Sequence, residues 1–154
     1  MAGTDTAAAR APDSLSLTLE PNPENAAVAR HAIAELAHRL GVDEAVRTSA
    51  EVVVTEAFTN ATRHAYTQGR PGPVEIAAKA RDDGFEIVVR DRGEGFRPRP
   101  ADPDGSGRMG LLLIAALADD VRFLHRPEGG TEVHAALTPT SALRALRSAE
   151  CPAC

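Results

Sequence analysis

The stretch TEAFTNATRHAY, Thr55 to Tyr66, sets polar side chains into a helix whose other faces are apolar. Glu56, Asn60 and His64 follow at intervals of four residues, which places them on one helix face. Polar groups in such a helix need partners, so this face is a candidate functional site. The alternative is a solvated face or a pair of helices in mutual hydrogen bonding. The apolar neighbours are Val52, Val53, Val54, Ala57, Phe58, Ala61 and Ala65.

Length and composition favour one acidic domain. The chain has 154 residues, of which 43% are apolar, and this is enough for one domain with a sizeable core. Its formal charge of -5 argues against a nucleic-acid surface, which needs a concentrated basic face. No apolar run is long enough to span a membrane, and the first residues lack the apolar core of a secretory signal. We therefore expect a cytoplasmic protein without direct contact to nucleic acid or membrane.

Hydrophobic periodicity divides the chain into strands and helices. Leucines alternate with Ser and Thr in residues 14–20, which predicts a strand, and helical spacing over 24–40 predicts a helix that ends at Gly41. Asp43 is the expected N-cap of a second helix, which carries the Thr55–Tyr66 stretch. Turn sequences separate two later pairs of strands, so each pair should form a hairpin. These strands are expected at 74–80, 85–90, 121–125 and 131–137, with a third helix at 111–118.

This element count predicts an α+β fold. Five strands and three helices suit a two-layer sandwich, with a mixed, mostly antiparallel sheet and the helices on one face. We expect this domain over residues 14–140. Residues 1–13 have no periodicity and are expected to form a disordered tail, and residues 141–154 a helical or disordered one.

A carboxylate at the end of a predicted strand is a candidate contact for a nucleotide base. Asp91 follows the strand sequence FEIVVR, and Gly93 and Gly95 come next. The carboxylate can accept a hydrogen bond from an amino group, and the glycines allow positive φ and let a flat ring approach the backbone. Adenine would donate from its exocyclic amine, whereas guanine would present a carbonyl oxygen and be repelled. The alternative is a plain turn, because Asp and Gly are common turn residues.

A second glycine-rich stretch, GSGRMGLLLIAALA, stands ahead of a predicted helix. There Gly105, Gly107 and Gly110 remove side chains from a place where backbone N–H groups and the helix dipole favour an anion. Arg108 adds a mobile positive charge. The dinucleotide fingerprint has the same spacing but follows a strand directly, whereas a polar loop precedes this stretch. The stretch is therefore a candidate phosphate site.

Together these groups predict one nucleotide pocket. The base would lie on Asp91, the phosphates on residues 105–110, and the polar helix face would point at the phosphates. Asn60 would then bind Mg2+, which accepts amide oxygen ligands and fills its other positions with phosphate oxygens and water. Glu56, one turn earlier, is placed to orient or deprotonate a nucleophile, either water or a protein hydroxyl.

The order of these motifs resembles that of the GHKL ATPases, also called the HATPase_c or Bergerat-fold family. The family's boxes E-x-x-x-N, D-x-G-x-G, a glycine loop before a helix and a late G-T match residues 56–60, 91–95, 105–110 and 130–131. The resemblance covers about residues 14–137. Within the family, the phrases TEAFTNATRHAY, VRDRGEGF and GLLLIAALADDV are most similar to the small anti-sigma factor serine kinases.

The resemblance implies a Bergerat-type sandwich that binds ATP with Mg2+. It also implies a protein serine kinase that sequesters a sigma factor, phosphorylates a serine of a STAS-type anti-anti-sigma partner, and pairs as a homodimer. Glu56 would be the catalytic base, Asn60 the Mg2+ ligand, and Thr131 a helper beside Asp91 at the adenine. The residues implied in nucleotide binding are Asn60, Asp91, Gly93, Gly95, Gly105, Gly107, Arg108, Met109, Gly110, Leu111 and Thr131.

Arg108 departs from the family pattern, which often has a glycine two places before the last glycine of the second box. The arginine either contacts the γ-phosphate or crowds the phosphates and weakens ATP binding. Two functions therefore stay open: an ATP-dependent serine kinase acting as a regulatory switch, and a protein-binding module of the same fold with weak or no catalysis. A bare ATPase without a protein acceptor is a third.

Overall fold

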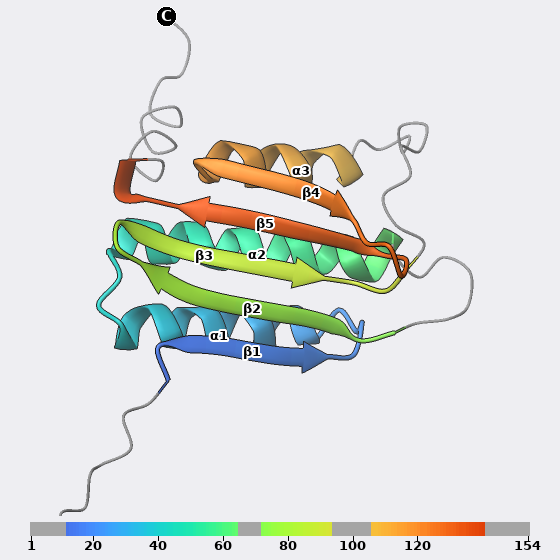
Figure 1. Cartoon of the computed structure of the whole chain (residues 1–154), viewed down its shortest axis with the longest axis horizontal. Helices are drawn as coiled ribbons and strands as arrows, with labels where there is room; N and C mark the ends of the chain where they lie inside the picture. The colour runs from blue at the N-terminus through green and yellow to red at the C-terminus, as the bar shows by residue number, and fades with distance from the viewer. Residues whose placement is uncertain (1–11, 65–71, 94–105, 141–154) are drawn as a thin grey trace, which may run out of the picture.

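The structure is a computed structural model that describes residues 12–64, 72–93 and 106–140 (Figure 1). In chain order its elements are β1 (Ser14–Leu19), α1 (Asn25–Arg39), α2 (Glu44–His64), β2 (Val74–Arg81), β3 (Gly84–Arg90), α3 (Ser106–Leu117), β4 (Asp120–His125) and β5 (Thr131–Leu137). The tails predicted for residues 1–13 and 141–154 lie almost wholly outside the described residues. Within the described ranges, no helix combines the length and apolarity that crossing a bilayer requires.

The five strands form one sheet in the order β1-β2-β3-β5-β4. The predicted hairpins are present, as β2 pairs with β3 and β4 with β5, and the pairing of β3 with β5 joins them. Every described pairing is antiparallel, whereas the sequence predicted a mixed, mostly antiparallel sheet. The reason is that β4 follows β3 through α3 and runs parallel to it, but β5 lies between the two strands. The predicted α+β class is confirmed.

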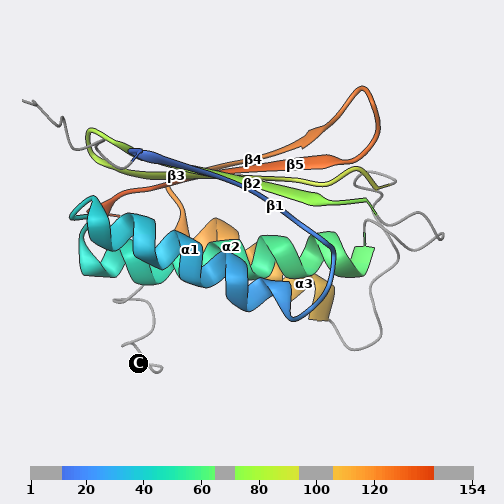
Figure 2. The same cartoon turned by 90° about the horizontal axis from the view of Figure 1, so that it is seen from below.

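The helices cover one face of the sheet (Figure 2). Strand alternation explains this arrangement, because every second residue of a strand points to the same face. In β2, for example, Val74, Ile76 and Ala78 are buried and the residues between them are partly exposed. Each large apolar side chain fully buried here contributes about 1.5–3 kcal/mol. The largest are Phe58, Phe85, Ile33, Leu36, Ile76, Ile87, Ile114, Leu137, Val46, Val53, Val54 and Val74.

α2 is the central helix and contacts α1, α3 and the middle of the sheet. The predicted end of α1 and the predicted start of α2 are confirmed. Gly41 ends α1 with φ of 67°, and the N–H groups of Gly41 and Val42 donate to carbonyls of the last turn, at 3.1 and 2.9 Å. Oδ1 of Asp43 accepts the N–H of Ala45 at 2.9 Å and caps α2. α2 is therefore anchored at its start and presents its C-terminal half to the site.

α3 begins at Ser106 rather than at the predicted Leu111. Gly107 and Gly110 therefore lie inside the helix, not in a loop ahead of it. Glycine lowers helix propensity, which is why sequence reasoning delayed the start. The packing of α3 against α2 requires a glycine at position 110, because a Cβ there would lie 2.6 Å from Oε2 of Glu56 on α2.

Candidate nucleotide-binding site

The predicted site residues gather at one end of the molecule. The C-terminal ends of α2 and β3, the start of α3 and the turn between β4 and β5 lie at the same end in both views (Figures 1 and 2). The antiparallel pairing of β3 with β5 brings Arg90 opposite Glu132, which sets Asp91 beside Thr131. Two groups of residues result, one between α2 and α3 and one between β3 and β5.

The first group consists of Glu56, Asn60 and Gly110. Glu56 and Asn60 are half-buried on α2, one turn apart, and Gly110 is buried in α3. A Cβ on Gly110 would lie 2.6 Å from Oε2 of Glu56 and 3.9 Å from Oδ1 of Asn60. The two oxygens therefore face the space that the glycine leaves open. This contact brings the E-x-x-x-N stretch of α2 against Gly110 of the glycine stretch.

The second group is built around the carboxylate of Asp91, which is 8% exposed. Its Oδ1 accepts backbone N–H groups from Gly93 at 3.0 Å and from Thr131 at 3.1 Å. The N–H of Asp91 in turn donates to the carbonyl of Thr131 at 3.0 Å. In the described part of the chain no group donates to Oδ2, so this oxygen can accept a hydrogen bond from a ligand.

Burial raises the pKa of Asp91 above the ordinary aspartate value. The two backbone hydrogen bonds and the nearby guanidinium of Arg126 favour the charged form, but they do not outweigh the loss of hydration. Perturbed carboxylates of this kind are typical of functional sites, although structural networks also produce them.

Two glycines of the β4–β5 turn allow this turn to approach Asp91 closely. Gly130 has φ of 100°, and a Cβ there would lie 2.1 Å from the carbonyl oxygen of Asp91. Gly129 has φ of 94° and lies beside the carbonyl oxygen of Gly93. Gly130 and Thr131, the late G-T pair, therefore allow the turn to contact the backbone of Asp91, and Thr131 binds Asp91 through its main chain.

Several predicted site residues lie outside the described part of the chain or are described only as backbone. Gly95 and Gly105 lie outside the described residues, and for Gly107, Arg108 and Met109 only the helical backbone is described. Leu111 is half-buried in α3. The described role of Gly93 is that its backbone N–H donates to Oδ1 of Asp91.

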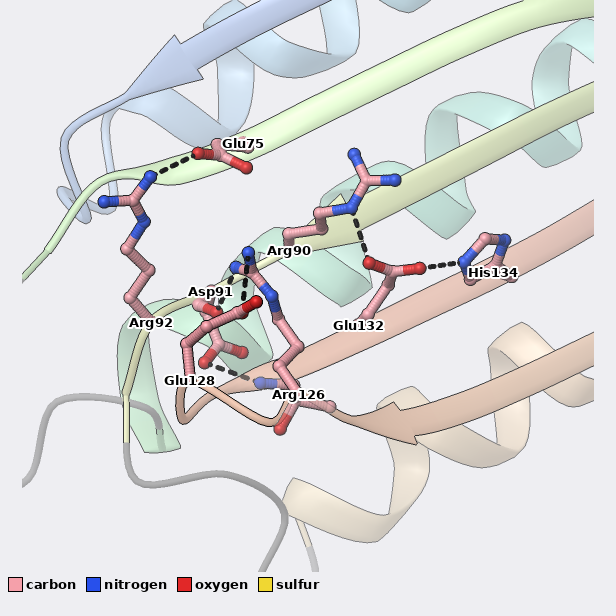
Figure 3. Close-up of polar contacts among 9 residues, drawn as sticks. Glu75, Arg90, Asp91, Arg92, Arg126, Glu128, Glu132 and His134 are labelled. Carbon is pink, nitrogen blue, oxygen red and sulfur yellow. Dashed lines mark hydrogen bonds and ion pairs between the residues drawn. The ribbon is translucent and has the colours of Figure 1, made fainter.

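Sequence reasoning missed Arg126. The stretch RPEGG was identified only as a turn, and a partly buried arginine at a turn gives no periodic signal. Its Nη1 donates to the carbonyl oxygen of Asp91 at 3.1 Å, and its Nη2 lies 3.5 Å from Oε2 of Glu128 (Figure 3).

A second polar cluster lies on the sheet face away from the helices. Arg90 donates from Nε to Oε2 of Glu132 at 2.5 Å, and Nε2 of His134 contacts the other carboxylate oxygen (Figure 3). Burial raises the pKa of Glu132, but the hydrogen bonds and charges of His134 and Arg90 outweigh it, so the pKa is lowered. Arg90 and Glu132 are the chain neighbours of Asp91 and Thr131, and neighbouring residues of a strand point to opposite faces of the sheet.

The comparison with protein families decides the identity of this fold. A family model described as the histidine kinase-like ATPase domain matches residues 19–137. The chain belongs to this family. The resemblance to the GHKL ATPases is thereby confirmed, and with it the Bergerat-type sandwich.

Curated proteins with similar sequences include serine-protein kinases and an anti-sigma factor. A serine-protein kinase RsbW of Oceanobacillus iheyensis is 32% identical over 124 residues, which are 72% of this chain and 78% of that protein. An anti-sigma F factor of the same organism is 32% identical over 130 residues, 78% of this chain and 88% of that protein. Serine-protein kinase RsbW of Bacillus subtilis is 28% identical over 123 residues, which are 71% of this chain and 77% of that protein.

Solved structures share the fold. The RsbU and RsbW domains of a Mycobacterium tuberculosis protein match with a TM-score of 0.64 and 24% identity over 83% of this chain, which spans 33% of that longer chain. The SiaB–SiaC complex of Pseudomonas aeruginosa matches with a TM-score of 0.60 and 16% identity, covering 79% of this chain and 87% of that one.

Proposed function

We propose that this chain is an anti-sigma factor with serine-protein kinase activity. It binds ATP with Mg2+, sequesters a sigma factor, and transfers the γ-phosphoryl group to a serine of a STAS-type anti-anti-sigma protein. The observation that carries the proposal is the close approach of Gly110 to Glu56 and Asn60, which places a carboxylate and an amide oxygen against the first turns of α3. The names of the similar curated proteins support the same activity.

Asp91 is proposed to select adenine. Its Oδ1 is already occupied by the N–H groups of Gly93 and Thr131, which leaves Oδ2 to accept the exocyclic amine. Guanine would place a carbonyl oxygen there, and two acceptors repel each other. Gly95 is proposed to keep the backbone accessible to the ring.

Glu56 is proposed as the catalytic base and Asn60 as the Mg2+ ligand. The oxygen donors fit a hard cation, because the amide oxygen of Asn60 faces the space beside Gly110 and magnesium takes few protein ligands. When bound, Mg2+ would neutralise charge on the phosphate oxygens. Glu56 takes the proton of the acceptor serine as the serine oxygen bonds to the γ-phosphorus and the bond between that phosphorus and the ADP oxygen breaks.

The start of α3 is proposed to hold the phosphates. Unpaired N–H groups and the positive end of the dipole face an anion at a helix start. The residues proposed to contribute are Gly105, Gly107, Arg108, Met109, Gly110 and Leu111. We propose that Arg108 contacts the γ-phosphate; if the arginine instead closes the phosphate site, the chain is a protein-binding module.

The remaining proposals concern the whole protein. We propose that residues 14–140 form the kinase domain, that the protein acts in the cytoplasm, and that it pairs as a homodimer. Sedimentation of the purified protein at several concentrations tests the last point, since a monomer at all concentrations would contradict it.

Calorimetric titration of Mg-ATP into the wild type and Asp91→Asn, with Mg-GTP as the control ligand, tests the nucleotide site. Loss of a hydrogen bond to a charged acceptor costs about 1.5–3 kcal/mol, so the variant should bind ATP about ten- to a hundredfold more weakly. GTP should not bind. If neither protein binds ATP, the binding-module alternative gains.

Phosphate transfer tests the kinase activity. Purified STAS-type proteins from the same genome are incubated with the chain and labelled ATP, and incorporation into a serine is measured. Glu56→Gln should reduce transfer by at least about a hundredfold, in line with the loss of a general base, while ATP affinity changes little. Transfer that is unaffected by this substitution would exclude Glu56 as the base, and label released only as free phosphate would identify a bare ATPase.

A further inference from the structure

Arg126 is unusually enclosed for a residue at a hairpin turn. Its side chain is 19% exposed, whereas Arg122 in the same hairpin is 69% exposed. Its backbone closes the turn, with its N–H 3.0 Å from the carbonyl of Gly130 and its carbonyl 3.0 Å from the N–H of Gly129. Its guanidinium leaves the turn and donates from Nη1 to the carbonyl oxygen of Asp91 at 3.1 Å (Figure 3).

Three hydrogen bonds join Asp91 to the β4–β5 hairpin, and only one of them uses a side chain of that hairpin. The other two run between Asp91 and the backbone of Thr131, at 3.0 and 3.1 Å. The bond from Arg126 holds the carbonyl that stands against Gly130, where a Cβ would lie 2.1 Å away. Arg126 therefore restrains the peptide plane that follows Asp91, and with it the direction of the carboxylate.

The charge of Arg126 has a second consequence. A guanidinium beside a buried carboxylate favours its ionised form, in which both oxygens are acceptors and neither carries a proton. Arg126 is itself held by Glu128 at 3.5 Å. Arg92, the residue that follows Asp91, is held at 2.9 Å by Glu75 of β2 (Figure 3).

We propose that Arg126 is a positioning residue for adenine selection. By holding the carbonyl of Asp91, it fixes the remaining carboxylate oxygen where an adenine amino group can donate to it. This inference rests on the proposed function. Arg126 itself makes no contact with the base in this assignment, and acts only through Asp91.

The test is a set of calorimetric titrations with Mg-ATP and with the Mg complex of purine riboside triphosphate, which lacks the 6-amino group. Arg126→Met should weaken ATP binding about tenfold, the effect of one lost hydrogen bond at the acceptor. It should change the affinity for purine riboside triphosphate less than about twofold, because Asp91 has no amine to accept there. Arg126→Lys, which keeps the charge and a donor, should restore ATP affinity to within about threefold of the wild type.

A double-substitution cycle separates positioning from general damage to the fold. In an Asp91→Asn background, Arg126→Met should weaken ATP binding less than about twofold further, since the interaction it supports is already lost. Arg122→Met is the matched control, because this exposed arginine pairs with Asp120 at 3.1 Å on the same hairpin, and it should leave ATP affinity unchanged. Urea unfolding of each variant establishes that it is folded, and Arg126→Gln replaces Arg126→Met if the latter does not fold.

Three results would overturn the inference. They are an equal loss for both triphosphates, an equal loss with Met and Lys, or a loss that persists in the Asp91→Asn background. If the wild type binds ATP and Asp91→Asn weakens it while Arg126→Met has no effect, the inference fails and the proposed function stands. If the wild type binds no ATP, both fail together.

Discussion

Gly110 and Gly130 show at the residue scale why two glycines of one site tolerate change differently. A Cβ on Gly110 meets Oε2 of Glu56 at 2.6 Å, which is the mobile end of a flexible side chain. A Cβ on Gly130 meets the backbone oxygen of Asp91 at 2.1 Å, and φ there is 100°. Backbone cannot move aside as a side chain can, and positive φ strains any other residue.

We therefore expect Gly110→Ala to fold and to lose activity. Alanine improves helix propensity by about 0.5–1 kcal/mol, which offsets the crowding, so the free energy of unfolding should change by less than about 1 kcal/mol. The carboxylate of Glu56 must shift, and a misplacement of about 1 Å can cost on the order of a hundredfold in rate. Phosphate transfer and urea unfolding measure the two effects. Gly130→Ala, the comparison, should lose several kcal/mol of stability; if both variants behaved alike, this distinction would be wrong.

Asp91 is expected to lower stability at neutral pH. Burial raises its pKa, so the native state binds this proton more tightly than the unfolded chain does. The associated stability is fully present below the unfolded value of about 3.9 and is lost as pH rises through the native pKa. Asp91→Asn does not titrate, so its free energy of unfolding relative to the wild type should increase between pH 3 and pH 7.

Urea titrations at several pH values measure this difference. Asp120→Asn is the control, since this residue is on the surface and its substitution should change stability by less than about 0.5 kcal/mol. A relative stability of Asp91→Asn that stays constant or falls with pH would show that the carboxylate is not destabilised by burial.

At the scale of elements, the pairing of β3 with β5 depends on a charged contact with the opposite pH response. Burial raises the pKa of Glu132, but the hydrogen bonds from His134 and Arg90 outweigh it and the pKa is lowered. The stabilisation is therefore present above the unfolded value of about 4.3 and is lost as pH falls through the native pKa.

Glu132→Gln should accordingly cost about 1 kcal/mol at pH 7, because the Arg90 side chain is 33% exposed and solvent weakens the ion pair. The cost should be smaller at pH 3 than at pH 7, because the stabilisation declines once the pH falls below the unfolded value of about 4.3. Thermal unfolding at both pH values measures it, and Glu44→Gln, at an exposed position of α2, is the control. An equal cost at both pH values would mean that packing, not charge, is lost.

The sequence predicted most elements because their signals are local. The alternating leucines of β1, the Gly41 end of α1 and the Asp43 cap of α2 each depend on neighbouring residues. The start of α3 was predicted too late because glycine lowers helix propensity. The sequence does not show that Gly110 lies inside the helix to allow contact with α2. The role of Arg126 was missed for the same reason, since Asp91 is 35 residues away.

At the scale of the whole molecule, the proposed domain of residues 14–140 contains every part of the described core. The family match ends at residue 137, within the last described segment. A shortened chain of residues 14–140 should therefore keep its Mg-ATP affinity within about twofold, and its free energy of unfolding within about 1 kcal/mol of the full chain.

A further truncation to residues 20–140 provides the contrast. It removes β1, whose Leu15, Leu17 and Leu19 pack against the core and whose backbone pairs with β2. Losing three half-buried leucines should cost about 2–4 kcal/mol, so this chain should unfold at a clearly lower urea concentration. Calorimetry and urea unfolding of the three chains measure both effects. If the 14–140 chain lost as much stability as the 20–140 chain, a terminal segment would have to be part of the folded domain, and the proposed boundaries would be wrong.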